Sequence, residues 1–203
     1  AEERSREFLL DVVGKIVGAM CDTQAELKTI YPALPDVIGR EVYAVTTAEL
    51  EERYPELTPK ERENKVCREH GTVFIMQIGG ALPRSGKPHD GRAPDYDDWS
   101  LNGDIMIWYA PMECALELSS MGIRVNAESL RSQLEISGHE ERAALPFHRA
   151  LLDGELPLTV GGGIGQSRLC MALLAKVHVG EVQCSVWPED MVKACADAGI
   201  ALL

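Results

Sequence analysis

A run of glycines near residue 160 most strongly constrains what this chain can fold into. Residues 159–169 read TVGGGIGQSRL, with three consecutive glycines, a fourth at Gly165 and an arginine at Arg168. Bare backbone lets a ligand approach the main chain, and free N–H groups at the start of the apolar helical pattern that follows favour anions. An arginine there can hold phosphate in a planar fork or stack on a base. The segment predicts an anion or nucleotide site, the alternative being a strand end packed under a helix.

The spacing of these glycines excludes the two commonest nucleotide-binding motifs. No register gives G-x-G-x-x-G, because Gln166 and Arg168 stand where a third glycine belongs. No Gly-Lys-Ser/Thr follows the run, so it is not a P-loop. A nucleotide site of another kind remains open.

Length, composition and charge bound the class of protein. The 203 residues are 45% hydrophobic and 26% charged, which suits one good-sized folded domain or a domain with a short extension. No apolar run approaches a membrane span and no signal-like segment opens the chain, so we expect no membrane partner. The net charge of −12 argues against extended contact with nucleic acid, but it leaves ATP open because local arginines and a metal can hold phosphates.

The six cysteines are widely spaced and lie mostly in apolar patterns. This arrangement predicts buried, reduced thiols in a cytosolic setting and no structural zinc site. The residues are Cys21, Cys67, Cys114, Cys170, Cys184 and Cys195.

Periodicity and capping signals predict a chain of mixed helices and strands. The expected helices cover residues 2–29, 127–136, 140–153, 165–177 and 190–198. Two more are marked by capping boxes at their starts: a short helix capped by residues 46–49, and a helix capped by residues 58–61 that runs to about residue 70. The expected strands cover residues 41–46, 72–78, 104–109, 115–125, 156–161 and 182–186, with a polar loop over 83–99. Because hairpins and helices both link the strands, we expect an α+β fold with a mainly antiparallel sheet flanked by helices.

Three carboxylates lie close together at Asp95, Asp97 and Asp98. In a solvated loop they need no partner. Alternatively, they capture an ammonium group such as the amine of an amino acid, with Arg92 ordering the acidic set.

Two more carboxylates lie inside apolar strand patterns, at Asp104 and Glu117. A carboxylate is costly to bury without a cation or hydrogen-bond donors. On adjacent strands the two could clamp Mg²⁺ for the phosphates of a nucleotide, unless one of them points to solvent.

Arg124, flanked by apolar neighbours and preceded by Ser120, is the candidate for binding a substrate carboxylate. A bidentate pair would satisfy its charge and its geometry together, although a structural acid could do the same. No serine lies in a G-x-S-x-G elbow, and among the histidines only His89, beside the acidic loop, is of interest. Nucleophilic catalysis therefore has no candidate.

Taken together, these motifs resemble the ammonia-dependent asparagine synthetase (aspartate–ammonia ligase) family. The resemblance rests on residues 92–98, 101–104, 117–124 and 161–169, in the same order, and extends across essentially the whole chain. It implies a catalytic domain similar to class II aminoacyl-tRNA synthetases, in which the glycine-rich segment with Arg168 resembles motif 3. The family activates aspartate with ATP and Mg²⁺ to a β-aspartyl adenylate, releasing pyrophosphate, and ammonia then gives asparagine and AMP. A cytoplasmic homodimer is implied as well.

The resemblance also implies roles for individual residues. At the nucleotide and its metal it implies Asp104 and Glu117 on Mg²⁺, and Leu118, Ser119, Gly163, Ile164 and Arg168 on ATP or AMP. At the substrate it implies Ser120, Arg124 and Asp97, with Arg124 on the carboxylate that is not activated and Asp97 on the amine or the ammonia. Asp97, Arg124 and Arg168 are the expected catalytic residues.

The chain departs from the family in two places. We expect residues 1–203 to be the C-terminal portion of a single class II synthetase-like catalytic domain, without the N-terminal part that supplies the dimer-forming segment and the motif 2 arginine. Ser100 also runs directly into Leu101, where the family carries a small glycine-containing loop. A chain that truly began at Ala1 would be inactive alone.

Two other functions stay open at this point. An aspartyl- or asparaginyl-tRNA synthetase core shares the adenylate chemistry, but it should carry an anticodon-binding module and a basic surface. A non-catalytic synthetase-like paralogue would bind an amino acid or nucleotide and regulate a partner.

Overall fold

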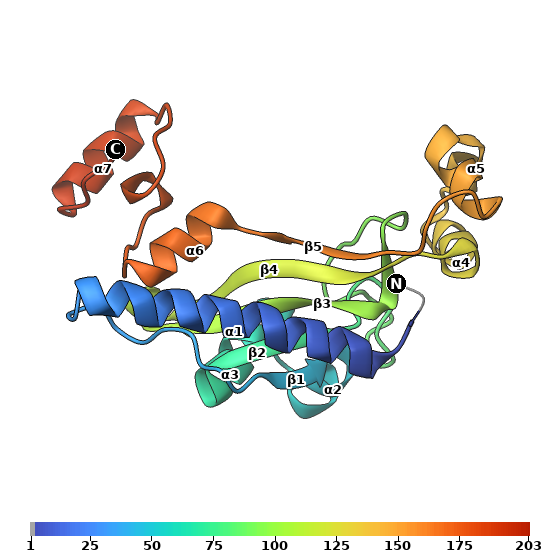
Figure 1. Ribbon diagram of the computed structural model, residues 1–203, viewed down its shortest axis with the longest axis horizontal. Coiled ribbons are helices and arrows are strands. Elements are labelled where there is room, and N and C mark those ends of the chain that lie inside the picture. The colour runs from blue at the N-terminus through green and yellow to red at the C-terminus, as the bar shows by residue number, and fades with distance from the viewer. Residues whose placement is uncertain (1–2) are drawn as a thin grey trace.

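A five-stranded sheet forms the centre of the molecule. The computed structural model describes residues 3–203, and Figure 1 shows the sheet running through their middle with helices around it. The strands lie in chain order; β1 and β2 are parallel and every later pair is antiparallel. They are β1 (Tyr43–Thr46), β2 (Thr72–Met76), β3 (Asp97–Tyr109), β4 (Cys114–Arg124) and β5 (Val160–Ile164). The expected α+β fold with a mainly antiparallel sheet is confirmed.

The long helix α1 (Arg6–Ile30) covers one face of the sheet (Figure 1). Its apolar stripe, which includes Leu9, Val13 and Val17, packs in one core with Phe74 of β2 and Met121 of β4. Each such side chain contributes about 1.5–3 kcal/mol when it is fully buried. The periodicity of the sequence predicts this helix and its end, but the helix starts at Arg6, where the side chain of Ser5 caps it, and not at residue 2, which lies outside the described residues.

Helices α2 (Thr47–Arg53) and α3 (Pro59–His70) pack on a second core. Leu50 and Val66 of these helices lie there with Val73, Ile75 and Met106 of the sheet. Both helices begin at the capping boxes that the sequence predicts, so their starts are fixed locally.

Two further groups of helices lie beyond the two ends of the sheet (Figure 1). The group after β4 consists of α4 (Ala127–Ser137), the 3₁₀ turn η2 (Glu140–Ala144) and α5 (Pro146–Leu152). The group after β5 consists of α6 (Gln166–Leu173), η3 (Val179–Glu181) and α7 (Glu189–Asp197), and a further 3₁₀ turn, η1 (Ala110–Met112), joins β3 to β4. The single helix expected over residues 140–153 is wrong, because Pro146 cannot continue a helix from the residues before it.

The strands correct the sequence analysis at three places. The glycine run itself forms β5, whereas the strand was expected over residues 156–161; glycine is depleted in strands, so the pattern favours a loop there. β3 begins at Asp97 rather than at residue 104, because ion pairs neutralise the acidic residues that enter it. Residues 182–186 form a turn and irregular chain instead of the expected strand.

The burial of the cysteine side chains agrees only in part with the sequence analysis. Cys21, Cys67 and Cys195 are buried as expected, but Cys170 and Cys184 are exposed, which corrects the expectation for these two thiols. Cys170 lies on the amphipathic helix α6 and Cys184 in irregular chain after it, and in such segments an apolar sequence pattern does not guarantee burial.

Within residues 3–203, no helix has both the length and the apolar character needed to cross a membrane.

Candidate active site

A row of polar and bare residues crosses three strands on one face of the sheet. Asp104 of β3 lies opposite Ser120 of β4, and Ser120 lies opposite Gly163 of β5. Directly opposite residues of antiparallel strands point to the same face. Ile75, opposite Asp104 on β2, belongs to the core under α2 and α3, so the row lies on that face of the sheet.

Asp104 is a buried carboxylate paired with an arginine. Arg92 forms an ion pair with it, and Ser120 lies directly opposite it on β4. Burial raises the pKa of Asp104 to about 6; the charge of Arg92 opposes this rise and that of Glu117 adds to it. Its Oδ1 atom is buried and has no hydrogen-bond partner among the described residues. An orphaned carboxylate oxygen beside a second acid is a candidate ligand for a cation.

A hollow of about 630 Å³ adjoins this row, where β5 meets α6. It is lined by Glu117 and Val179 and by residues 163–168. Glu117 and Arg168 form an ion pair, with 3.3 Å between Oε1 and Nη1, and both side chains are partly exposed. A Cβ atom built on Gly163 would meet nothing within 4 Å, so the glycine opens the wall of the hollow rather than fitting a packed neighbour. The hollow therefore offers a ligand one carboxylate, one guanidinium and the exposed main chain of a glycine.

Arg124 lies further along the same face, at the end of β4. It is opposite Asp97 in the β3–β4 register and forms an ion pair with it. Its guanidinium lies over the ring of Tyr96 at 4.9 Å from the ring centroid. A Cβ atom on Gly161 would stand 2.8 Å from Nη2 of Arg124, so this glycine makes room for the arginine.

Asp97 is buried, and one of its oxygens, Oδ2, has no hydrogen-bond partner in the described part of the chain. Burial raises its pKa above the ordinary value, although the charges of Arg124 and Arg92 oppose the rise. Gly122 lets Asp97 lie close, because a Cβ atom there would approach its Cγ to 3.0 Å. The free oxygen of Asp97 can accept a hydrogen bond from an amine.

The three carboxylates of the acidic run do not converge on one site. Asp95 pairs with Arg142 and His148 at 3.1 Å each, Asp97 pairs with Arg124, and Asp98 pairs with Arg4 at 2.5 Å. Only Asp97 joins the face that carries Asp104 and Ser120. The ammonium-binding prediction, which stays a prediction, therefore rests on Asp97 alone among the three carboxylates.

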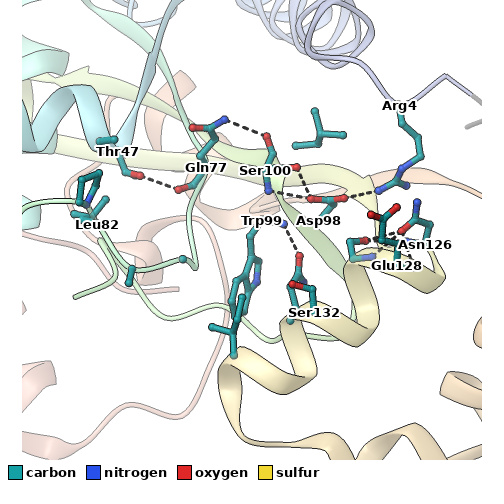
Figure 2. Close-up of a pocket in the computed structure, with 18 residues that line it drawn as sticks. Arg4, Thr47, Gln77, Leu82, Asp98, Trp99, Ser100, Asn126, Glu128 and Ser132 are labelled. Atoms are coloured by element: carbon teal, nitrogen blue, oxygen red, sulfur yellow. Dashed lines mark hydrogen bonds and ion pairs between the residues drawn. The ribbon is translucent and has the colours of Figure 1, made fainter. Parts of the chain in front are cut away.

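Asp98 lines a second hollow, of about 720 Å³, between the start of α1, the loop after β2 and α4 (Figure 2). There it accepts hydrogen bonds from Arg4 and from the backbone and hydroxyl of Ser100. Asp98 is thus satisfied by its own neighbours. None of the other predicted site residues lines this hollow.

Leu118 and Ser119 follow Glu117 at the edge of the hollow beside α6, and their side chains are buried inside the protein. The side chain of Leu118 is buried in the core under α1, while its carbonyl accepts the N–H of Gly165. Ser119 is buried opposite Ile105, and its hydroxyl has no partner among residues 3–203. Any nucleotide contact of Leu118 must therefore come from the backbone. Ile164, in contrast, is 46% exposed and lines the hollow.

The side chains at this face could not hold a magnesium ion by themselves, but two of them could hold it together with the phosphates of a nucleotide. Within the described residues, no group of three or more His, Cys, Asp or Glu side chains could hold a metal ion. Mg²⁺ is usually bound by one or two carboxylates together with waters and substrate phosphates. Asp104 and Glu117 meet that need, since their charges are close enough to interact and one oxygen of Asp104 is unpaired.

Sequence reasoning missed two contributions to this site. Arg92 was expected to order the acidic run but lies on Asp104 instead, and Tyr96 was passed over between two aspartates. The sequence of a polar loop does not indicate which carboxylate an arginine in it will pair with. Tyr96 lies in a bend immediately before β3, so the period of a strand does not place it, and only the pairing of this segment with the end of β4 brings it to Arg124.

Comparison with known proteins decides the family. The model for a family described as aspartate-ammonia ligase matches residues 1–199. The chain belongs to the aspartate–ammonia ligase family. It is 55% identical to the aspartate–ammonia ligase of Limosilactobacillus reuteri and 56% identical to that of Lactobacillus acidophilus, each over 202 residues. The alignments cover the whole of this chain but 60% of those proteins, so the chain spans about 60% of the length of the curated relatives it matches.

Solved structures support the fold of this family member. An aspartyl-tRNA synthetase from Entamoeba histolytica superposes with a TM-score of 0.61 at 16% identity, over 89% of this chain and 40% of that one. An asparaginyl-tRNA synthetase of the same organism, in complex with asparaginyl-adenylate, gives a TM-score of 0.56 over 88% and 44%. At this identity the likeness shows the fold alone, and the fold is that of the class II synthetases.

Proposed function

We propose that this chain forms the nucleotide- and substrate-binding part of an enzyme that makes L-asparagine from L-aspartate, ammonia and ATP. The observation that carries the proposal is the arrangement on one sheet face. The hollow with Glu117 and Arg168 lies beside Asp104, and the Arg124–Asp97 pair lies further along the same strands. This arrangement suits a nucleotide next to an amino acid with two carboxylates.

The reaction follows from bringing these two substrates together. An oxygen of the side-chain carboxylate of aspartate attacks the α-phosphorus of ATP, and pyrophosphate leaves. Ammonia then attacks the activated carbonyl carbon and gives up a proton, and AMP leaves with the carboxylate oxygen. The products are asparagine, AMP and pyrophosphate.

Arg168 is the residue proposed to hold the nucleotide. Its guanidinium lies at the mouth of the hollow, where it can neutralise phosphate charge that develops during the transfer. Gly163 and Ile164 form the adjoining wall, and the backbone at Leu118 and Ser119 lies behind it.

Arg124 and Asp97 are proposed to bind the backbone end of aspartate. A guanidinium matches the α-carboxylate in a bidentate pair, and the unpaired oxygen of Asp97 suits the α-amine or an incoming ammonia. Ser120 lies opposite Asp104 in the register, on the same strand as Arg124, and can orient the carboxylate that reacts. Asp97, Arg124 and Arg168 are thus the proposed catalytic residues.

Mg²⁺ is proposed to bind at Asp104 and Glu117 together with the phosphates of ATP. When bound, it would neutralise the charge of the phosphates. Arg92 forms an ion pair with Asp104, so this arginine and a bound cation would share one carboxylate. A cytoplasmic homodimer is part of the same proposal, and its support is membership of the family.

Product analysis tests this function. The protein expressed from the complete gene is incubated with labelled aspartate, ATP, Mg²⁺ and ammonium, without tRNA. Asparagine, AMP and pyrophosphate should form in equal amounts, and glutamine should replace ammonium poorly. ADP and phosphate as products would overturn the proposal. Attachment of the labelled amino acid to added tRNA, without asparagine formation, would favour a tRNA synthetase instead.

A further inference from the structure

Tyr96 restrains the guanidinium of Arg124 together with two other groups. Asp97 holds one end of it by an ion pair, and the backbone of Gly161 leaves just enough room beside Nη2. Tyr96 offers its ring at 4.9 Å from the guanidinium carbon, which is within the range of a cation–π contact. Because Tyr96 is itself 43% exposed, its ring is not there to fill the core.

A buried network holds the chain segment that carries Tyr96. The side-chain amide of Gln133, on α4, donates to the carbonyls of Pro94 and Asp97 at 2.9 Å each and accepts the N–H of Trp99 at 2.8 Å. Gln133 is 4% exposed, so these hydrogen bonds are shielded from water. The backbone on both sides of Tyr96 is therefore fixed to the helix.

Asp95 adds a second anchor immediately before Tyr96. Its carboxylate pairs with Arg142 of η2 and with His148 of α5, and His148 is almost fully buried. The backbone carbonyl of Tyr96 also accepts the N–H of Val125, the residue after Arg124. The tyrosine and the arginine thus sit on segments that are joined directly and are both tied to the α4–α5 group.

We infer that Tyr96 is a positioning residue for substrate recognition: it fixes the guanidinium of Arg124 at the place where the backbone carboxylate of a short dicarboxylic amino acid must bind. The inference rests on the proposed role of Arg124. A guanidinium held by a ring, a carboxylate and a bare backbone cannot follow a longer substrate, and small misplacements of a substrate are costly. Tyr96 therefore supports both the affinity for aspartate and the preference for aspartate over glutamate.

The test measures the affinity for aspartate separately from turnover. Isothermal titration calorimetry gives the dissociation constant of L-aspartate, L-glutamate and ATP for the protein expressed from the complete gene and for its variants. Loss of the ring in Tyr96→Leu should weaken aspartate binding roughly 2- to 30-fold, the range expected for a cation–π contact. ATP binding should stay unchanged, and the ratio of aspartate to glutamate affinity should fall.

Matched variants separate positioning from folding. Tyr96→Phe keeps the ring and should restore the affinity for aspartate, whereas Tyr96→Gln, which also lacks the ring, should behave like Tyr96→Leu. Tyr31→Leu changes another exposed tyrosine, at the end of α1, and should leave all three affinities unchanged. Thermal unfolding of each variant shows that it is folded.

Equal aspartate affinity in Tyr96→Leu, Tyr96→Gln and the unaltered protein would overturn the positioning role while leaving the proposed function intact. A weakening that Tyr96→Phe does not reverse would overturn it too. If the unaltered protein bound no aspartate and made no asparagine, the proposed function itself would fail, and the role of Tyr96 with it.

Discussion

At the scale of single residues, two glycines of the run serve different purposes. Gly161 accommodates the guanidinium of Arg124, since a Cβ atom there would meet Nη2 at 2.8 Å. Gly163 faces open space and lines the hollow near Arg168. Neither has the positive φ that only glycine adopts readily, so both are explained by space and not by backbone strain. The sequence predicts that the glycines leave space for another group, but only the pairing of β5 with β4 shows which group lies beside each glycine.

Substituting the two glycines should therefore impair different steps. Gly161→Ala pushes the end of the Arg124 side chain, so the KM for aspartate should rise about 10-fold or more, in line with the cost of small misplacements in a site. Gly163→Ala adds a methyl group to the wall of the hollow and should raise the KM for ATP. Steady-state kinetics with each substrate varied in turn checks both. The reverse pattern would show that the two glycines have been assigned to the wrong ligands.

Arg168 should matter for the transfer step more than for folding. It is half exposed, and within residues 3–203 its polar contacts are with the carboxylate and the backbone carbonyl of Glu117, so Arg168→Ala should unfold at nearly the same temperature as the unaltered protein. Loss of one donor to developing charge costs roughly 100- to 1,000-fold in kcat. Aspartate-dependent exchange of pyrophosphate into ATP measures this loss. Arg131→Ala, at an exposed arginine of α4, is the control, and a normal exchange rate in Arg168→Ala would refute the role.

At the scale of elements, local signals predict helices better than strands. The capping boxes at Thr46 and Thr58 satisfy backbone groups within a few residues, so the starts of α2 and α3 can be read from the sequence. β5 is a strand because β4 offers a partner along Val160–Ile164, and no property of three glycines reveals that partner. The start of β3 depends likewise on Arg4 and Arg124, which lie far away in the chain.

The attachment of the α4–α5 group to β3 should depend on pH through Asp95. Burial alone would raise the pKa of Asp95, but hydrogen bonds from His148 and Arg142 outweigh it and lower the pKa. A carboxyl group with a lowered pKa stabilises the fold above its unfolded value, near pH 4, and this contribution is lost as pH falls through the folded pKa. Because the group is partly exposed, Asp95→Asn should lower the free energy of unfolding by about 1–2 kcal/mol at pH 7.

Denaturant unfolding between pH 7 and pH 3 checks this dependence. The difference between Asp95→Asn and the unaltered protein should shrink toward the acid end of that range. A difference that stays constant with pH would mean that Asp95 acts through packing and not through its charge.

At the scale of the whole molecule, one sheet face carries both of the proposed substrate sites. Arg168, Asp104 and Arg124 come from α6, β3 and β4, and the antiparallel register aligns their positions across neighbouring strands. The sequence motifs together with the family resemblance predict most of these residues and the class II fold. What they could not predict is pairing between groups distant in the chain: Arg92 on Asp104, the separation of Asp95 and Asp98 from Asp97, and Tyr96 over Arg124.

The central claim is that this face joins aspartate to the α-phosphate of ATP. The most direct measurement uses aspartate carrying ¹⁸O in its side-chain carboxylate, with ATP and ammonium, and mass spectrometry of the products. One ¹⁸O atom should appear in AMP, because the carboxylate oxygen stays on the phosphorus it attacked when ammonia displaces AMP. Label in inorganic phosphate accompanied by ADP, or unlabelled AMP, would contradict the account.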